Sequence, residues 1–235
     1  MKGIELSPRL LAIAGEVPQG AKLADIGTDH AYLPIALLQS GKIAAAIAAD
    51  VNEGPLSRGR AAAQGQGISE ISFRCCDGLE GISPEEADTI VIAGMGGDTI
   101  SHILAGVSWS SNGGLRYLLQ PMSSVPELRQ WLSDNGFSVQ KEVLVREDEK
   151  LYVVFVVISG KGEAYSLGEL WAGKQWRGMD GFHRLDYLDD LIVRRSRALA
   201  GLQQAKGGRE ADIAETQQVL TELRQLREEW ILWQQ

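Results

Sequence analysis

Cysteine is almost absent from this sequence of 235 residues, and its two cysteines, Cys75 and Cys76, are adjacent. Neighbouring cysteines cannot cross-link distant parts of a chain, and no CxxC or Cys/His spacing indicates a metal site. We therefore expect neither a disulfide framework nor a bound metal. Unpaired thiols fit a reducing compartment, so the expected location is the cytoplasm.

Long hydrophobic runs are also missing. No stretch reaches the roughly 18 apolar residues that cross a bilayer, so we expect no membrane partner. The first residues carry Glu5 and Glu16 within their apolar pattern, which argues against a signal peptide. With 44% hydrophobic residues, the chain is nevertheless long enough to bury one full core and to carry an appendage.

Basic residues are too few to balance the acidic ones, and the formal net charge is −8. This balance argues against nucleic-acid binding by the protein as a whole. The charge is uneven, however, because residues 1–160 hold 12 basic and 19 acidic side chains, whereas residues 161–235 hold 11 and 12. The stretch 191–209 has no acid and five basic residues: Arg194, Arg195, Arg197, Lys206 and Arg209. We interpret this stretch as a local basic patch that could bind nucleic acid, with an ordinary solvated helix face as the alternative.

Apolar runs that end in Gly or Asp alternate with helical patterns along the first part of the chain. The runs predict buried parallel strands at 21–27, 42–50, 71–77, 87–97 and 115–121. Helical stretches lie between them at 30–40, 55–66, 97–105 and 126–135, and Ser7-Pro8 predicts the start of a first helix. This alternation is typical of a doubly wound α/β sheet.

The alternation ends after Gly136. Two strand patterns, 137–147 and 150–159, are joined by a short charged turn and predict a β-hairpin. A parallel sheet that closes with an antiparallel hairpin is the arrangement of class I methyltransferases, whereas NAD-binding Rossmann domains usually lack it. The expected fold is therefore a Rossmann-like methyltransferase sheet, although a fold by itself is weak evidence for chemistry.

A helical pattern occupies the end of the chain. From about Phe182, apolar residues recur at helical spacing in two stripes, and Gly207-Gly208 separates them. We expect an antiparallel, coiled-coil-like helical hairpin, and so two domains, 1–160 and 161–235. The stripes can pack within the chain or against a partner copy, so a monomer and a homodimer both stay open.

The turn after the first strand carries the main cofactor signal. It reads Asp25-Ile26-Gly27-Thr28-Asp29-His30, with one glycine and two carboxylates. A dinucleotide-binding turn has three glycines, so that a diphosphate can approach the next helix. Two carboxylates would repel a diphosphate but accept a sulfonium and an ammonium group. The turn therefore favours S-adenosylmethionine over a nicotinamide cofactor.

Acidic residues also end the second and third predicted strands. Asp50 lies 23 residues beyond Gly27, the offset at which an acid accepts hydrogen bonds from ribose hydroxyls. Asp77-Gly78 ends the third strand, where an acid could meet the adenine amino group. The alternative is that these aspartates are ordinary turn residues. We expect the first three strand ends to form one cofactor pocket.

The fourth predicted strand ends in a glycine-rich turn, Gly94-Met95-Gly96-Gly97. Three glycines in four positions mean that the backbone passes close to either a ligand or a packed helix. The tetrapeptide Asn/Asp-Pro-Pro-Tyr, which many amino-group methyltransferases carry here, is missing. An exocyclic amine is therefore not the obvious methyl acceptor.

In combination, these motifs resemble the TrmK family, the bacterial tRNA (adenine-22-N1)-methyltransferases. The resemblance covers nearly the whole chain and is carried by the segments 24–34, 54–56, 77–79, 92–97, 119–121 and 147–152, of which 24–34 and 92–97 are specific in combination. One departure is Met122, which stands where the family often has Asn after Leu-Gln-Pro.

The resemblance implies a function and two sets of site residues. The expected activity is methyl transfer from S-adenosylmethionine to N1 of adenosine 22 in tRNA. The residues implied in cofactor binding are Asp25, Gly27, Asp50, Val51, Asp77, Gly78, Gly94, Met95, Gly96 and Gly97. The residues implied to face the acceptor base are Arg9, Asp29 and His30.

Adenine N1 already has a lone pair, so positioning and a nearby carboxylate are the main requirements, and Asp29 is the candidate carboxylate. His30 could orient Asp29 or contact the base, and Arg9 could contact RNA near the reaction. The competing hypotheses are a methyltransferase of small molecules or proteins, and a non-catalytic partner protein that keeps the fold.

Overall fold

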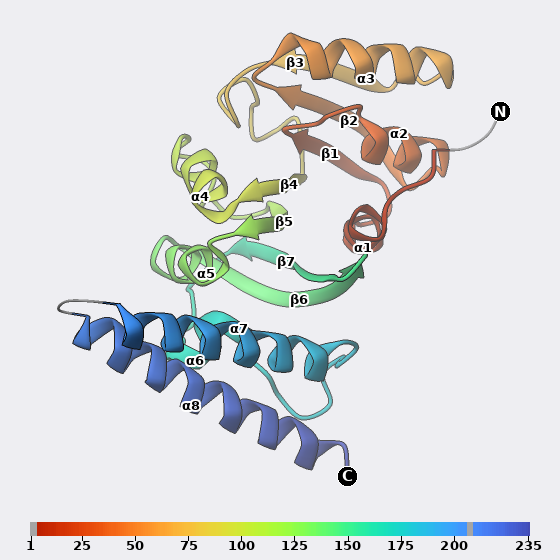
Figure 1. The fold of residues 1–235 in the computed structure, drawn as a ribbon. Coiled ribbons are helices and arrows are strands. Elements are labelled where there is room, and N and C mark those ends of the chain that lie inside the picture. Colours follow the sequence, from red (N-terminus) through yellow and green to blue (C-terminus); the bar gives the residue numbers. More distant parts are fainter. Residues whose placement is uncertain (1–3, 206–208) are drawn as a thin grey trace. The chain divides into compact units, whose positions relative to one another are not determined.

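The computed structural model describes residues 4–205 and 209–235, and the chain divides into two compact units, Met1–Glu163 and Ala164–Gln235 (Figure 1). The predicted interhelical glycines, Gly207 and Gly208, and the predicted RNA-binding residue Lys206 lie outside the described residues.

The first unit is built on a seven-stranded sheet in the order β3-β2-β1-β4-β5-β7-β6. Its strands are β1 (Ala21–Ile26), β2 (Ile43–Asp50), β3 (Ile71–Cys75), β4 (Thr89–Gly96), β5 (Arg116–Ser123), β6 (Phe137–Glu147) and β7 (Lys150–Ser159). The first five strands are parallel, whereas β7 is antiparallel to both β5 and β6. The doubly wound sheet with a terminal antiparallel hairpin is confirmed.

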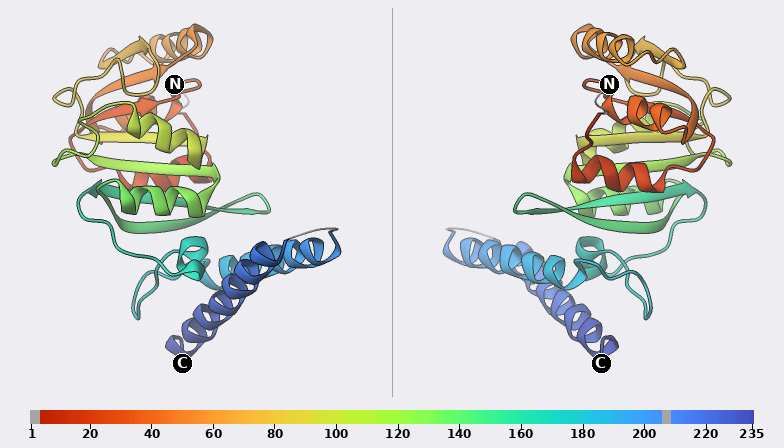
Figure 2. Two further views of the ribbon diagram at one scale, coloured as in Figure 1. Left: turned by 90° about the vertical axis from the view of Figure 1, so that its left-hand side faces the viewer. Right: turned by 90° about the vertical axis from the view of Figure 1, so that its right-hand side faces the viewer.

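Helices cover both faces of this sheet, as Figure 2 shows. One face carries α1 (Pro8–Glu16) and α2 (Tyr32–Gln39), and the other carries α4 (Gly97–Ala105) and α5 (Val125–Asp134). The helix α3 (Glu53–Gly65) packs against β2 and β3. Each face therefore has its own hydrophobic core.

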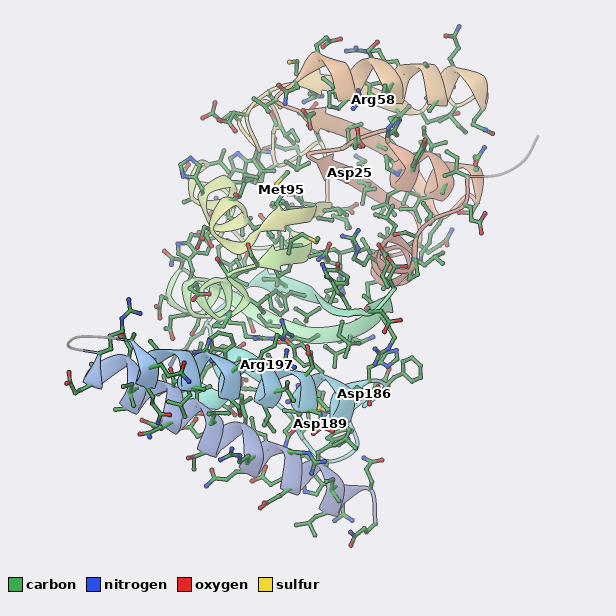
Figure 3. The ribbon with its side chains drawn as sticks, viewed as in Figure 1. Asp25, Arg58, Met95, Asp186, Asp189 and Arg197 are labelled. Atoms are coloured by element: carbon green, nitrogen blue, oxygen red, sulfur yellow. The ribbon has the colours of Figure 1, made fainter. Side chains whose placement is uncertain are left out.

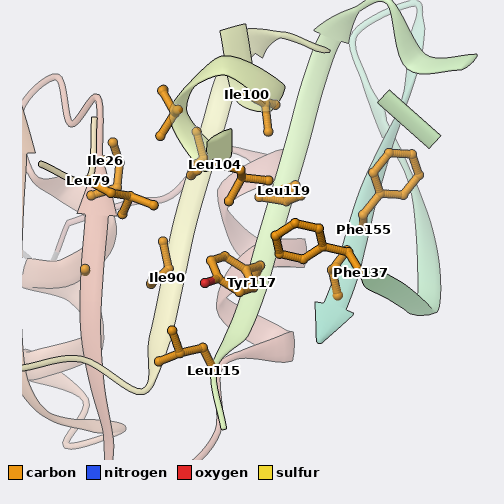
Figure 4. Close-up of a cluster of buried hydrophobic side chains, with 14 of the residues drawn as sticks. Ile26, Leu79, Ile90, Ile100, Leu104, Leu115, Tyr117, Leu119, Phe137 and Phe155 are labelled. Atoms are coloured by element: carbon orange, nitrogen blue, oxygen red, sulfur yellow. The ribbon is translucent and has the colours of Figure 1, made fainter. Parts of the chain in front are cut away.

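The period of two along each strand separates the two cores. In β1, Leu23 belongs to the core under α1 and α2, while Ala24 belongs to the core under α4 and α5. In the core under α4 and α5, shown in Figure 4, Ile100 and Leu104 of α4 pack against the sheet. Because both faces are buried, the strands are continuous apolar runs rather than alternating ones.

The second unit consists of three helices, α6 (Leu167–Ala172), α7 (Arg184–Gln204) and α8 (Glu210–Trp233). The helices α7 and α8 pack against each other, and their buried side chains include members of both predicted stripes: Leu188, Leu191, Leu220, Leu223 and Trp230. Over residues 4–205 and 209–235, no helix combines the length and the apolar character needed to cross a membrane.

Sequence reasoning missed α6. This helix begins with a capping box, in which the Ser166 hydroxyl accepts from the Glu169 backbone N–H and the Glu169 carboxylate accepts from the Ser166 N–H. The Ser-x-x-Glu pattern was visible in the sequence and could have identified the start of the helix. The helix is then fixed against α8, because the Gly168 N–H donates to Glu222 at 2.6 Å.

The predicted helix starts agree with the structure to within two residues, but Ser7 does not cap α1 through its side chain. The helix α2 begins at Tyr32 rather than at residue 30, because Ala31 takes a left-handed conformation with φ +54°. The helix α1 does begin at Pro8, as predicted. The Ser7 hydroxyl, however, contributes to the hydrogen bonding of Glu147.

Gly97, the first residue of α4, packs against the turn between β5 and α5. A Cβ atom at this position would lie 2.3 Å from the backbone oxygen of Ser124 and 3.0 Å from that of Ser123. These oxygens belong to backbone, which cannot move aside as a flexible side chain can. The packing therefore requires glycine here.

We expect Gly97→Ala to destabilise the first unit by about 1–3 kcal/mol, the usual range for overpacking. Urea unfolding of the two proteins measures the difference. The control is Gly15→Ala in α1, where an added Cβ meets no atom of the described residues within 4 Å; there the free energy of unfolding should stay the same or rise slightly. Equal stability of Gly97→Ala and the wild type would contradict the packing argument.

Candidate active site

The candidate site lies at the carboxyl end of β1, where the order of the sheet reverses. Ile26 pairs with Ala49 of β2 on one side and with Ile92 of β4 on the other. Ligands of open α/β sheets bind in the crevice at such a switch point. A cavity of about 310 Å³ is present here, lined by segments of α1, the β1–α2 turn, β4 and β5.

Asp25 is the buried carboxylate of this cavity. By strand alternation it lies on the same face of the sheet as Leu23, under α1 and α2, and its exposed fraction is 8%. Burial raises the pKa of Asp25 from 3.8 to about 6, although a hydrogen bond with the Thr28 side chain opposes the shift. A cationic ligand would relieve the cost of ionising this group.

Gly27 provides the turn that leads from β1 into the cavity. Its φ is +72°, and its N–H donates to the Ala49 carbonyl at 2.8 Å. A Cβ atom at Gly27 would lie 1.9 Å from the Met95 methyl group, so Met95 of the glycine-rich turn covers this residue. The two turns therefore depend on each other.

The glycines of the glycine-rich turn have different surroundings. Gly94, with φ +76°, lines the cavity, and an added Cβ would meet no atom of the described residues within 4 Å. The backbone is therefore open to a ligand at this point. Gly97, in contrast, packs against Ser124, and an added Cβ at Gly96 would lie 3.1 Å from the Ser123 hydroxyl.

The other predicted cofactor residues lie at the same edge of the sheet but outside the lining of this cavity. Asp50 pairs in register with Cys75, and its side chain accepts from the Asn52 N–H at 2.7 Å. Val51 and Asp77 are exposed, and an added Cβ at Gly78 would meet Ile103. The cavity therefore brings together Asp25, Gly27 and Gly94, while the ends of β2 and β3 lie beside it.

Asp29 and His30 line the cavity on the side of α2. The Asp29 carboxylate accepts a hydrogen bond from the Arg58 guanidinium at 2.6 Å and lies 3.5 Å from His30 Nε2. The hydrogen bond from Arg58 is the main reason why the pKa of Asp29 lies below its usual value. The His30 ring stacks on Tyr32 with centroids 4.9 Å apart.

Arg9 lines the cavity from α1, but its guanidinium is already held by several groups. It forms an ion pair with Glu147 at 2.9 Å, donates to the Gln120 side-chain oxygen at 3.1 Å, and lies over the Tyr152 ring. The same Gln120 oxygen accepts from the Gly94 N–H at 3.2 Å. Arg9 thereby links α1 and the β6–β7 hairpin to the glycine-rich turn.

Burial opposes the ionised form of Glu147, but hydrogen bonds from Arg9 and Ser7 outweigh it and hold the pKa of this carboxyl below its usual value. The sequence motifs included Gln120 and Glu147 without assigning them a role. Their signal was weak, consisting of one polar residue that follows an apolar strand and one acid before a turn. Met122, at the position where the family often has Asn, contributes its sulfur as an acceptor for Arg9 at 3.2 Å.

The methyltransferase-domain family matches residues 6–155 of the chain. A tRNA (adenine(22)-N(1))-methyltransferase of Bacillus subtilis is 41% identical over 165 residues, which cover 70% of this chain and 69% of that protein. The chain belongs to the TrmK family.

Solved structures of TrmK-family proteins extend the similarity to almost the whole chain. The B. subtilis m1A22 tRNA methyltransferase TrmK is 33% identical with a TM-score of 0.76, and the match covers 96% of this chain and 97% of that one. M. capricolum TrmK in complex with S-adenosyl-homocysteine is 27% identical with a TM-score of 0.79, covering 95% and 98%. A Streptococcus pneumoniae protein in complex with S-adenosyl-L-methionine is 32% identical with a TM-score of 0.78, covering 92% and 100%.

In this TrmK-family chain, the predicted RNA-binding arginines of the second unit fall into two groups. Arg194 pairs with Asp190 one helical turn away, and Arg195 lies over the Trp171 ring at 4.2 Å and donates to Thr216. Arg197 and Arg209 have exposed side chains, and neither forms an ion pair with the part of the chain that the structure describes. The second group is therefore free to meet an external anion.

The raised pKa of Asp25 predicts a pH-dependent cost in stability. The Asp25 carboxyl holds its proton more tightly in the folded protein than in the unfolded chain. Protonation of Asp25 therefore contributes its full stabilisation below pH 3.8, and this contribution is lost as the pH rises through about 6. We expect Asp25→Asn to be more stable than the wild type by about 1–3 kcal/mol at pH 7.5, and the difference to shrink towards pH 4.

Urea unfolding at both pH values measures this difference. Asp77→Asn is the matched control, because it makes the same change at an exposed side chain two residues beyond the end of β3; it should change the stability by less than about 0.5 kcal/mol. A pH-independent effect of Asp25→Asn would contradict the assignment of the cost to ionisation.

Proposed function

We propose that this protein transfers the methyl group of S-adenosylmethionine to N1 of adenosine 22 in tRNA. The observation that carries the proposal is the 41% identity to the B. subtilis tRNA (adenine(22)-N(1))-methyltransferase over 165 residues, or 70% of the chain. The cavity at the end of β1 has the chemistry that this reaction needs, because it joins a buried carboxylate to an open glycine backbone.

The residues of the cavity fit S-adenosylmethionine. Asp25 is an acid whose ionisation is opposed by burial, and such a group gains from a cationic ligand. Gly94 leaves free the space that a side chain would fill, so a ligand can approach its backbone. Asp50, Val51, Asp77, Gly78 and the turn 94–97 are proposed to hold the ribose and the adenine along the same edge of the sheet.

S-adenosylmethionine supplies an electrophilic methyl group on a sulfonium. The protein then has to hold adenine N1 in line with that methyl group, and this positioning provides much of the rate. N1 has a lone pair, so no residue needs to remove a proton before the transfer. The ring becomes cationic during the reaction, and the Asp29 carboxylate is proposed to stabilise the developing charge. His30, held between Asp29 and Tyr32, is proposed to orient Asp29.

The second unit is proposed to bind the tRNA backbone. N1 of adenine lies on the Watson–Crick edge, so the base must be exposed at a cost that phosphate contacts offset. Arg197 and Arg209 are exposed arginines of the basic stretch that form no ion pair with the described residues, and Lys206 belongs to the same stretch of sequence. Arg9 is proposed to act closer to the reaction, by holding Gln120 and the glycine-rich turn. The proposed location is the cytoplasm, and the oligomeric state is left open between monomer and homodimer.

The direct test is incubation of the purified protein with unmodified tRNA and labelled S-adenosylmethionine. We expect one methyl group per tRNA and a reverse-transcription stop at position 22, and no label in a tRNA that carries guanosine there. Asp29→Ala should lower kcat by at least about 100-fold while changing the dissociation constant of S-adenosylmethionine less than about threefold. Labelling of a protein or a small molecule instead of tRNA would overturn the proposal.

The proposal for the second unit predicts different effects for two neighbouring arginines of α7. Arg197→Glu should weaken tRNA binding about three- to tenfold and reduce the slope of log K against log salt by about 0.7–0.9. Arg194→Glu makes the same charge change on the same helix but removes an arginine that Asp190 already neutralises, so its effect should be clearly smaller. Filter binding across a salt series distinguishes them, and equal effects would mean that only overall charge matters.

A further inference from the structure

Arg58 is an exposed cation at the border of the candidate active site, and neither the sequence motifs nor the proposed mechanism uses it. It lies on α3 (Figure 3), and its guanidinium reaches Asp29 of the β1–α2 turn, with Nη2 2.6 Å from Oδ1. The side chains are 51% and 70% exposed. Asp29 lines the cavity, so the pair lies beside it, and both side chains are largely exposed to solvent.

Arg58 differs from the neighbouring arginines in how firmly it is held. Arg9 is 24% exposed and is bound by Glu147, Gln120 and Met122 together. Arg60, on the same helix as Arg58, forms an ion pair with Glu53 and lies over the Phe73 ring. Arg58 is the most exposed of these three, and Asp29 is the ion-pair partner that the structure records for it.

The ion pair conflicts with the proposed role of Asp29. A carboxylate 2.6 Å from a guanidinium is nearly neutralised, so its field at the acceptor base is weak. Stabilisation of a cationic adenine requires the carboxylate without its counter-ion. Asp29 therefore has to lose Arg58 before the reaction, or it contributes little to the rate.

We propose that Arg58 is exchanged on substrate binding: a phosphate of the tRNA takes the Arg58 guanidinium from Asp29 and leaves the Asp29 carboxylate free to face the adenine. This inference rests on the proposed tRNA methyltransferase function. Arg58 then acts as an RNA-binding residue, and its transfer to the phosphate leaves Asp29 available for the reaction.

The exchange is physically favourable. Exposed ion pairs contribute little to stability, so Asp29 gives up Arg58 at low cost. A guanidinium binds phosphate through two parallel hydrogen bonds, so Arg58 keeps a strong partner after the exchange. Because the carboxylate becomes free only when RNA is bound, the acceptor side of the site is completed by its own substrate.

A double-mutant cycle on tRNA binding tests the exchange in the full-length protein. Arg58→Ala should weaken tRNA binding about three- to tenfold and lower the salt slope by about 0.7–0.9, while Arg58→Lys should retain most of the slope. Asp29→Ala should tighten binding about two- to fivefold, because it releases Arg58 before RNA arrives. This tightening should vanish in the Arg58→Ala background, whereas simple removal of a repulsive charge would tighten binding in both backgrounds.

Steady-state kinetics supplies the second measurement. Arg58→Ala should raise KM for tRNA but leave kcat within about twofold of the wild type, since Asp29 is free in the bound complex in either case. If Arg58 merely holds Asp29 in its working orientation, kcat falls and tRNA binding does not change, which would overturn the proposal. Arg60→Ala is the matched control on the same helix, and an equal loss of tRNA binding there would also overturn it.

The outcome separates this inference from the proposed function. If the wild-type protein methylates no tRNA, the proposed function fails and the exchange has no substrate. If the wild-type protein methylates adenosine 22 but the effects of the Asp29 and Arg58 substitutions on the free energy of tRNA binding are additive, the proposed function is supported and the proposed exchange is wrong.

Discussion

A carboxylate buried at the end of a parallel strand is the constraint on which the site depends. Asp25 lies two residues after Leu23 in β1, so the alternation of the strand directs it into the space beneath α1 and α2. Burial there raises its pKa to about 6, which means that the folded protein bears a cost for keeping it ionised at neutral pH. The ionised Asp25 thus lowers the stability of the folded protein, and a cation bound in the adjacent cavity would offset this cost.

The arginines of this protein have the same chemistry but different roles, because their surroundings differ. Arg9 is held by an acid, an amide and a ring, so it works as a fixed link between α1, the hairpin and the glycine-rich turn. Arg195 is packed on Trp171 and stabilises the helices of the second unit. Arg58 has one exposed partner and can change it. The number of partners around a guanidinium therefore separates structural cations from those available to a substrate.

The sequence predicted the sheet well because buried parallel strands leave a local signal, and the bounds of the hairpin strands were predicted without error. It predicted less of the site. The aspartates at the ends of three strands suggested one pocket, but the cavity takes in Asp25 and leaves Asp50 and Asp77 beside it. Local patterns show where a strand ends but not how far a turn then carries the next side chain. Arg58 was missed for the same reason, since its meeting with Asp29 depends on how α3 packs, 29 residues along the chain.

An acidic protein that acts on a polyanion needs a way to concentrate its few available cations where the substrate arrives. The net charge of −8 repels RNA at long range, so a general basic surface does not attract the substrate here. Binding must instead rely on individual arginines that have no acid beside them, such as Arg197, or that can leave the acid they have, as proposed for Arg58. An arginine that can leave its acid adds selectivity, because an anion that does not reach Arg58 leaves Asp29 paired with it. The acidity of the chain, which first argued against an RNA substrate, then becomes part of how the site distinguishes a correctly placed RNA from any other anion.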